Sequence, residues 1–400
     1  MVDSIIKQCL QKSTGSDHLN HLQANWQDAS WPSSKEEIWR YSKLHWLNEP
    51  WMIVDGSIGS AIIDKFLHQY DLTMQDTDIV SFQGQFLPRQ IEGVRYLSDD
   101  TLNTKDITWS DDFFNQLGCL GLNDWTSIEV GQGQQLDAQW HCVLDQEKSW
   151  QNLKLTIHVK KDAHLALRMN MIAAHAVTNL SINIKVDQGG SCKIISWASP
   201  HSRLIIDHSV DLHARSEFRY DTLNFEAGWC HERTHMTVGA NANAMLSGLL
   251  LPNTNQSDHK AIYVHHIAPS GQSMQKFYSV ADANGLAAFH GRAIVGHEAP
   301  KTNARQLARA LMLSKTCEVY SRPELEIDID DVQCQHGSSI GELDKKALFY
   351  LRSRGICIDE ARAMLINAFI EEVVSNLDIS IQKWIRKRIG SHGKGRGNYE

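Results

Sequence analysis

Cys334 and His336 are metal-binding residue types separated by a single glutamine. On a β-strand, residues two apart project to the same side about 6.6 Å apart, so the thiolate and the imidazole could face a common metal. Both groups are good ligands for iron or for an iron–sulfur unit. Two ligands do not complete such a site, so the remaining ligands would have to come from a partner. A structural role for the pair is the alternative interpretation.

A second pattern, His231-Glu-Arg-Thr-His235, fits the H-E-x-x-H motif of zinc proteases. That chemistry requires a helix, because only there do residues four apart bring both imidazoles to one metal. The following residues, Met236-Thr-Val-Gly239, have strand character, and on a strand residues four apart lie about 13 Å apart. We therefore expect no metalloprotease. The chain also has no P-loop, G-x-S-x-G motif or Rossmann glycine pattern, which predicts that it has no ATPase activity.

Composition narrows the class of protein and its compartment. The 400 residues are 42% hydrophobic with a net charge of −8, so no basic surface indicates binding to nucleic acid or to an anionic membrane. No apolar run approaches the ~20 residues of a membrane helix, and the amino terminus lacks the apolar segment of a secretion signal. The eight cysteines include no C-x-x-C pair, which indicates reduced thiols. We expect a cytoplasmic protein.

The periodicity of apolar residues divides the chain into three regions. Residues 1–122 are mostly helical or irregular in pattern. Between residues 123 and 340 apolar and polar residues alternate, as in strands with one buried face, and the absence of a convincing helix argues against an α/β sheet. The expected strands lie at residues 153–159, 165–171, 180–186, 204–212, 218–225, 234–238, 244–249, 262–266, 274–280 and 325–329.

Residues 341–400 return to a helical period. The sequence predicts one helix over residues 343–354, which Gly355 can end in the left-handed conformation. Asp359 is expected to cap a second helix. The apolar face of that helix carries Ala361, Met364, Leu365, Ala368, Phe369 and Val373. A basic, glycine-rich tail follows.

Periodicity does not decide the architecture of the β region, because a sandwich, a propeller and a parallel β-helix all alternate in this way and no fixed-length repeat is evident. A series of longer motifs is more informative. In chain order these are Val264-His-His-Ile-Ala-Pro269, Phe289-His-Gly-Arg-Ala-Ile-Val295, Ala299-Pro-Lys-Thr-Asn-Ala-Arg-Gln306, Pro323-Glu-Leu-Glu-Ile327, Asp330-Asp-Val-Gln-Cys-Gln-His-Gly337 and Ala347-Leu-Phe-Tyr-Leu-Arg-Ser-Arg-Gly-Ile356. In these segments the chain resembles the SufB/SufD family of iron–sulfur cluster assembly proteins.

Two positions make the resemblance closer to the SufD branch than to the SufB branch. SufB-type sequences have a glutamate directly after the histidine that matches His336, where this chain has Gly337. They also carry a cysteine near the segment that matches residues 306–313, where this chain has none. A SufB-like paralogue is the alternative within the family.

The resemblance implies a right-handed parallel β-helix over residues 123–340, flanked by the two helical regions. It implies a scaffold without catalytic activity in the SufBCD complex. This scaffold would pair with a SufB-type paralogue through the β-helix and with a SufC-type ATPase through the carboxyl-terminal helices, and it could form a homodimer in isolation. The expected interface residues are Leu325, Ile327 and Ile329 towards the paralogue, and Leu365 and Phe369 towards the ATPase.

The resemblance also implies a role for the first pair of residues. His336 and Cys334 would bind iron or a nascent iron–sulfur cluster transiently, sharing it with the SufB-type partner. Two rival interpretations keep the same fold. One is a binding or structural β-helix without a metal role. The other is a polysaccharide lyase or hydrolase, which would need paired charged residues on successive rungs, whereas the charges of the β region are scattered.

Overall fold

The computed structural model describes most of the chain from residue 113 onward and parts of the region before it. The described residues are 3–12, 32, 39, 44–54, 78–87, 90–91, 94–97, 113–173, 175–224, 227–375, 377, 379, 381–383 and 385–386. The basic tail expected at the carboxyl terminus lies, after Arg386, outside the described residues. No helix among the described residues is long and apolar enough to span a bilayer.

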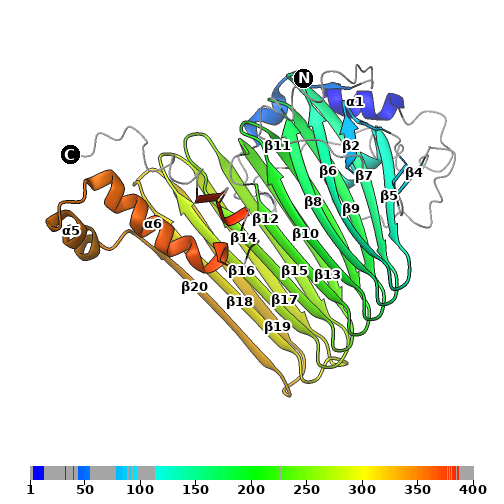
Figure 1. Cartoon of the computed structure of the whole chain (residues 1–400). Helices are drawn as coiled ribbons and strands as arrows, with labels where there is room; N and C mark the ends of the chain where they lie inside the picture. Colours follow the sequence, from blue (N-terminus) through cyan, green and yellow to red (C-terminus); the bar gives the residue numbers. More distant parts are fainter. Residues whose placement is uncertain are drawn as a thin grey trace.

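Two parallel β-sheets face each other and take successive strands in turn, which makes the chain a parallel β-helix (Figure 1). One sheet has the order β19-β17-β15-β13-β11-β9-β7-β5-β4, with β1 paired to β7. The other has the order β20-β18-β16-β14-β12-β10-β8-β6-β2-β3. The expected parallel β-helix is thus confirmed, and the sandwich and the propeller are excluded.

The strands of the first sheet are β1 (Met52–Ile53), β4 (Val94–Leu97), β5 (Asp124–Val130), β7 (Ser149–Val159), β9 (Val177–Val186), β11 (Arg203–Leu212), β13 (Trp229–Val238), β15 (Ser257–His266), β17 (Leu286–Val295) and β19 (Glu318–Ile327). Those of the second sheet are β2 (Ile79–Phe82), β3 (Gln85–Phe86), β6 (Gln135–Leu144), β8 (His164–Ala173), β10 (Ser191–Ala198), β12 (Glu217–Leu223), β14 (Asn243–Leu250), β16 (Gln272–Ala281), β18 (Asn303–Met312) and β20 (Gln333–Gly341).

The rungs of the β-helix differ in length, which explains why no fixed repeat is visible in the sequence. Asp207 and Arg233 are neighbours in register and lie 26 residues apart. Gln275 and Gln306 are also neighbours in register, but they lie 31 residues apart. The turns absorb the difference while the strands keep their register.

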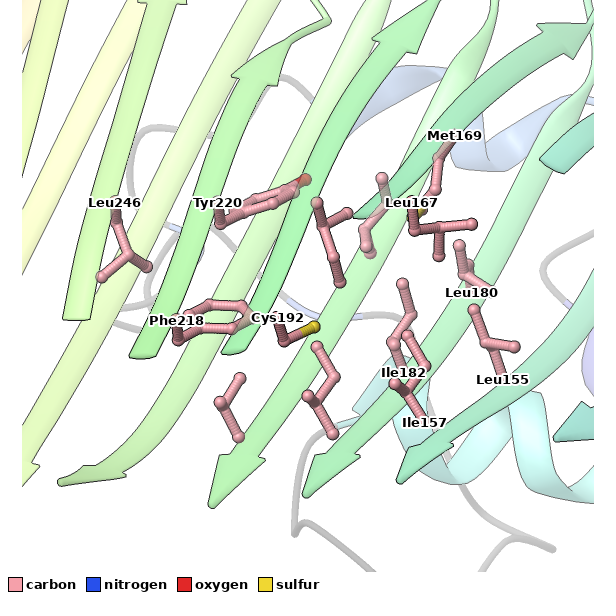
Figure 2. Close-up of a cluster of buried hydrophobic side chains, with 14 of the residues drawn as sticks. Leu155, Ile157, Leu167, Met169, Leu180, Ile182, Cys192, Phe218, Tyr220 and Leu246 are labelled. Carbon is pink, nitrogen blue, oxygen red and sulfur yellow. The ribbon is translucent and has the colours of Figure 1, made fainter. Parts of the chain in front are cut away.

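The interior between the two sheets is filled by the inward-facing residues of each strand. Because side chains alternate across a strand, every second residue continues a column along the β-helix. Figure 2 shows part of this core, where Leu155, Ile157, Leu167, Met169, Leu180, Ile182, Cys192, Phe218, Tyr220 and Leu246 pack between the sheets. The alternation predicted from the sequence is therefore the inward and outward alternation of a β-helix.

Among its described residues, the first region, expected to be helical or irregular over residues 1–122, contains three helical segments and also strands β1 to β4. Its helical segments are α1 (Asp3–Lys12), η3 (His45–Asn48) and α4 (Phe113–Leu120). Strands β3 and β4 pair antiparallel with β2 and β5. Aromatic side chains from this region, including Trp46 and Phe114, pack with Trp150 and Trp229 on the outer face of the first sheet.

The carboxyl-terminal helices are α5 (Lys345–Ser353) and α6 (Ile358–Val374). Gly355 follows α5 with a φ of +85°, as predicted for its end. The prediction that Asp359 caps α6 is wrong: Cys357 occupies the cap position, and Asp359 lies in the first turn. The buried face of α6 packs on β14 and β16 through Ile366, Ile370, Val373 and Val374.

Candidate functional site

The two ends of the β-helix differ. At one end, the antiparallel strands β3 and β4 complete the sheets. At the other, β19 pairs only with β17 and β20 only with β18 among the described strands. Both last strands are therefore edges that present unpaired backbone groups. We call this end, formed by β19, β20 and the connection between them, the open end (Figure 1).

Apolar side chains lie at the open end without being buried. Leu325 and Ile327 are in register with the buried residues Ala293 and Val295, so they continue the interior columns. Ile327 is 41% exposed, because no further rung covers it within the described chain. Ile329 lies in the connection after β19 and not, as expected, on the strand itself. All three residues predicted at the interface with the paralogue thus lie at the open end.

Cys334 and His336 lie on β20, the strand on which the spacing argument depends. Their register neighbours Ala304 and Gln306 are buried, so both side chains continue interior columns and face the same side of the strand. Cys334 is half-buried, and burial raises the pKa of its thiol. His336 is exposed. A metal bound here would have to displace the thiol proton, while the imidazole is directly accessible.

The described residues contain no group of three or more His, Cys, Asp or Glu side chains arranged to hold a metal ion. Cys334 and His336 therefore fit iron as two ligands of different kind on one face, but the described part of the chain supplies no third ligand beside them. The donor set suits an incomplete site at an interface.

Gln306 is a residue of the site that the sequence did not reveal. It is buried, lies next to His336 in the ladder, and donates from Nε2 to Gln275 Oε1 at 3.3 Å. It is the last residue of the Ala299–Gln306 motif, so the motif marked its position but not its role.

The protease look-alike is on a strand, as predicted. His231 and His235 belong to β13 and face outward from the β-helix, whereas Glu232 faces inward. His231 stacks on Trp39 at 4.1 Å between ring centroids, and its Nδ1 lies 2.9 Å from Nδ1 of His259. The motif contributes to packing, and its glutamate points away from its histidines.

A charged cluster inside the β-helix surrounds Glu232. The Lys260 ammonium contacts Glu232 and lies 2.7 Å from Oδ1 of Asp258, and Thr222 donates to Glu232 at 2.7 Å. Burial raises the pKa of Asp258 to about 6. Burial, the largest single effect, works to raise the pKa of Glu232, but the Lys260 ammonium together with His208 and Thr222 outweighs it and keeps that pKa below its usual value. The buried Lys260 ammonium thus forms ion pairs with two buried carboxylates, those of Glu232 and Asp258.

Leu365 and Phe369, the residues expected to bind the ATPase, both lie on α6, but Phe369 lies on the side of the helix that packs against the β-helix. Phe369 packs on Tyr278 of β16 with ring centroids 5.1 Å apart, and it belongs to the edge of the core beneath the helix. Leu365 is half-exposed. None of the nine residues of α5 is buried, and Phe349 on this helix is 74% exposed. The free apolar surface of the two helices therefore includes Phe349, Tyr350, Ile358 and Met364.

Comparison with known proteins gives a consistent result. The family model described as "SUF system FeS cluster assembly, SufBD core domain" matches residues 121–369, which is more than half of the chain. The iron–sulfur cluster assembly protein SufD of Escherichia coli is 26% identical over 384 residues, covering 91% of this chain and 90% of the relative. SufD of Bacillus subtilis is 34% identical over 124 residues, covering 31% of this chain and 28% of the relative. The chain belongs to the SufBD family of iron–sulfur cluster assembly proteins.

Proposed function

We propose that this chain is a cytoplasmic, non-catalytic scaffold that docks a SufB-type paralogue on its open end and holds iron or a nascent cluster at the seam. The observation that carries this proposal is the coincidence of three features on the last rung. These are two unpaired strand edges, exposed apolar side chains that continue the core, and the Cys334–His336 pair. A second β-helix stacked on this end would pair the edges and bury the apolar columns.

Iron or the nascent cluster is cargo in this proposal, and each side chain has a limited task. His336 offers an imidazole nitrogen at the exposed rim. Cys334 offers a thiolate after losing its proton, a loss that its partial burial makes harder. The remaining ligands come from the paralogue, so the cargo is held only while the two proteins are together. This arrangement suits assembly followed by release.

The carboxyl-terminal helices offer a separate surface for a SufC-type ATPase. α5 has no buried residue, and Phe349 and Tyr350 on it are exposed aromatic side chains. Met364 on α6 is 46% exposed. Aromatic residues and methionine are enriched at protein interfaces, so we place the main ATPase contact on α5 and the start of α6, in addition to Leu365.

The test is iron loading of the complex that forms when this chain is co-expressed with its SufB-type and SufC-type partners. We expect His336→Ala to leave complex formation intact and to lower the iron content and the yield of clusters. His297→Ala, which replaces an exposed histidine in the turn after β17, is the matched control and should leave both unchanged. A His336→Ala complex with the iron content of the wild type would contradict the proposal.

A further inference from the structure

Gln306 lies next to His336 in the ladder, and its side chain has one polar atom without a hydrogen-bond partner among the described residues. Gln306 is only 3% exposed, and it lies between Ala304 and Ala308 on the inward face of β18. Its Nε2 donates to Gln275 Oε1, but its Oε1 has no hydrogen-bond partner among the described residues. A buried carbonyl oxygen without a donor destabilises the folded chain, so a nearby N–H is expected to bond to this atom.

The interior leaves room for this pair of amides, in which Gln275 Nε2 also has no hydrogen-bond partner among the described residues. Gly291 faces inward on β17, and a Cβ atom added to it would lie 2.4 Å from Gln275 Oε1. The missing side chain at Gly291 therefore leaves the space that the Gln275 amide fills. Gln275 in turn holds the Nε2 end of Gln306, which leaves the Oε1 end of Gln306 for its other neighbour.

That other neighbour is His336. The two residues are partners in the parallel ladder of β18 and β20, about 4.8 Å apart, with side chains on the same face. The neutral imidazole carries one N–H and one lone pair, and the hydrogen bond made by one nitrogen decides which nitrogen is free for a metal. Gln306 offers the acceptor that such a ring needs.

We propose that Gln306 is a positioning residue for His336: when the exposed His336 ring turns inward, Oε1 of Gln306 accepts the N–H of one ring nitrogen, and the lone pair of the other nitrogen is then presented to iron. The inference rests on the proposed role of His336 as an iron ligand. It assigns to Gln275 the task of orienting Gln306, and to Gly291 that of making room for Gln275. The orientation of the His336 ring thus depends on Gln306 in the neighbouring rung and on Gln275 in the rung beyond it.

The experiment records nitrogen NMR spectra of the full-length chain with labelled histidine side chains, and identifies the His336 signals by their loss in His336→Ala. We expect one neutral tautomer to dominate at His336 in the wild type. Gln306→Leu should give a mixture of both tautomers. Ferrous iron, titrated into the complex with the SufB-type and SufC-type partners while the broadening of the His336 signals is followed, should then bind about tenfold more weakly. Gln275→Leu should shift both readouts in the same direction but less.

The matched control is Gln335→Leu, which removes the same side chain from an exposed position beside His336 on β20. It should change neither the tautomer nor the affinity. Gln306→Met, of similar length and without an amide, replaces Gln306→Leu if thermal unfolding shows that the leucine variant does not fold. An unchanged tautomer in a folded Gln306 variant overturns the inference.

The two proposals fail in different ways. If His336→Ala binds ferrous iron as the wild type does, the proposed role of His336 fails. If His336→Ala loses iron while Gln306→Leu and Gln306→Met keep the wild-type tautomer and affinity, only the positioning role of Gln306 fails.

Discussion

Ser338 on β20 donates a hydrogen bond of 2.8 Å to Ser321 on β19, joining the last strands of the two sheets across the inside of the open end. Both serines lie on the last rung and face the interior, since their register neighbours are Ala308 and Phe289. The open end is therefore held together by side chains of this chain alone. A partner would meet an ordered surface and would not have to order two separate strands first.

Because the open end is ordered without a partner, one charged substitution on it can test whether it is the docking surface. Ile327→Asp places a carboxylate among apolar columns that a partner would bury, so we expect at least a tenfold weaker association with the SufB-type paralogue. The variant should fold normally, because Ile327 is already 41% exposed. Sedimentation of the mixed proteins measures the association. Ile267→Asp, at a 45% exposed isoleucine after β15, is the matched control and should associate as the wild type does.

Removing the buried cation should destabilise the β-helix strongly. Lys260→Met leaves Glu232 and Asp258 without their ammonium in a fully buried place, and we expect a loss of about 3–5 kcal/mol in the free energy of unfolding. Denaturant unfolding followed by circular dichroism measures it. Lys276→Met is the control: its partner Glu372 is half-exposed and stays solvated, so the loss should be about 1 kcal/mol or less. Equal losses in the two variants would contradict this account.

The sequence predicted the individual strands well because their main signal is local, whereas the parallel β-helix itself was expected only from the family resemblance. Alternation along each strand reports which residues face inward, and this held for residues 153–159 and for most other expected strands. The same signal could not reveal Lys260 and Glu232, since charged residues at inward positions break the rule that the prediction uses. They are tolerated because they pair with each other, and pairing between rungs is invisible in the local pattern.

The face of α6 could not be predicted for a different reason. Apolar residues occur all around this helix, so helical periodicity does not select one side. Ala361 and Val373 of the expected face are buried. Leu365 and Phe369 of that face are only half-buried, whereas Ile366 and Ile370, which were not on it, are buried in the cluster with β14 and β16. For the metal-binding pair, spacing was enough to predict a shared face on a strand. The amides behind His336 come from strands about 30 residues apart, which spacing alone cannot bring together.

Acid should destabilise the protein through its buried histidines. Burial, assisted by the nearby His265, lowers the pKa of His266 from 6.5 to about 4, so the folded chain keeps this ring neutral. The unfolded chain takes up the proton below pH 6.5, and stability present above that pH is lost as the pH falls towards 4. Each such histidine costs roughly 1.4 kcal/mol per pH unit in this window.

His266→Gln isolates this effect, because the glutamine amide reaches the position of Nε2, can still bond to Ser273 and does not titrate. Between pH 7.5 and 5 the variant should lose roughly 2 kcal/mol less unfolding free energy than the wild type. Asp258 acts in the opposite direction, since its pKa is raised to about 6, but it is common to both proteins and cancels in the comparison. Parallel pH profiles for variant and wild type would show that His266 does not titrate on unfolding.

The two carboxyl-terminal phenylalanines should respond differently to replacement. Phe369→Ala removes a ring that packs on Tyr278, so it should lower the thermal midpoint of unfolding. Phe349→Asp changes a side chain that is 74% exposed and should leave the midpoint unchanged. If α5 carries the main contact with a SufC-type ATPase, Phe349→Asp should abolish its co-purification, while Phe369→Ala should weaken it only as far as α6 is loosened. If Phe349→Asp co-purifies with the ATPase at the wild-type level, the main contact does not lie on α5.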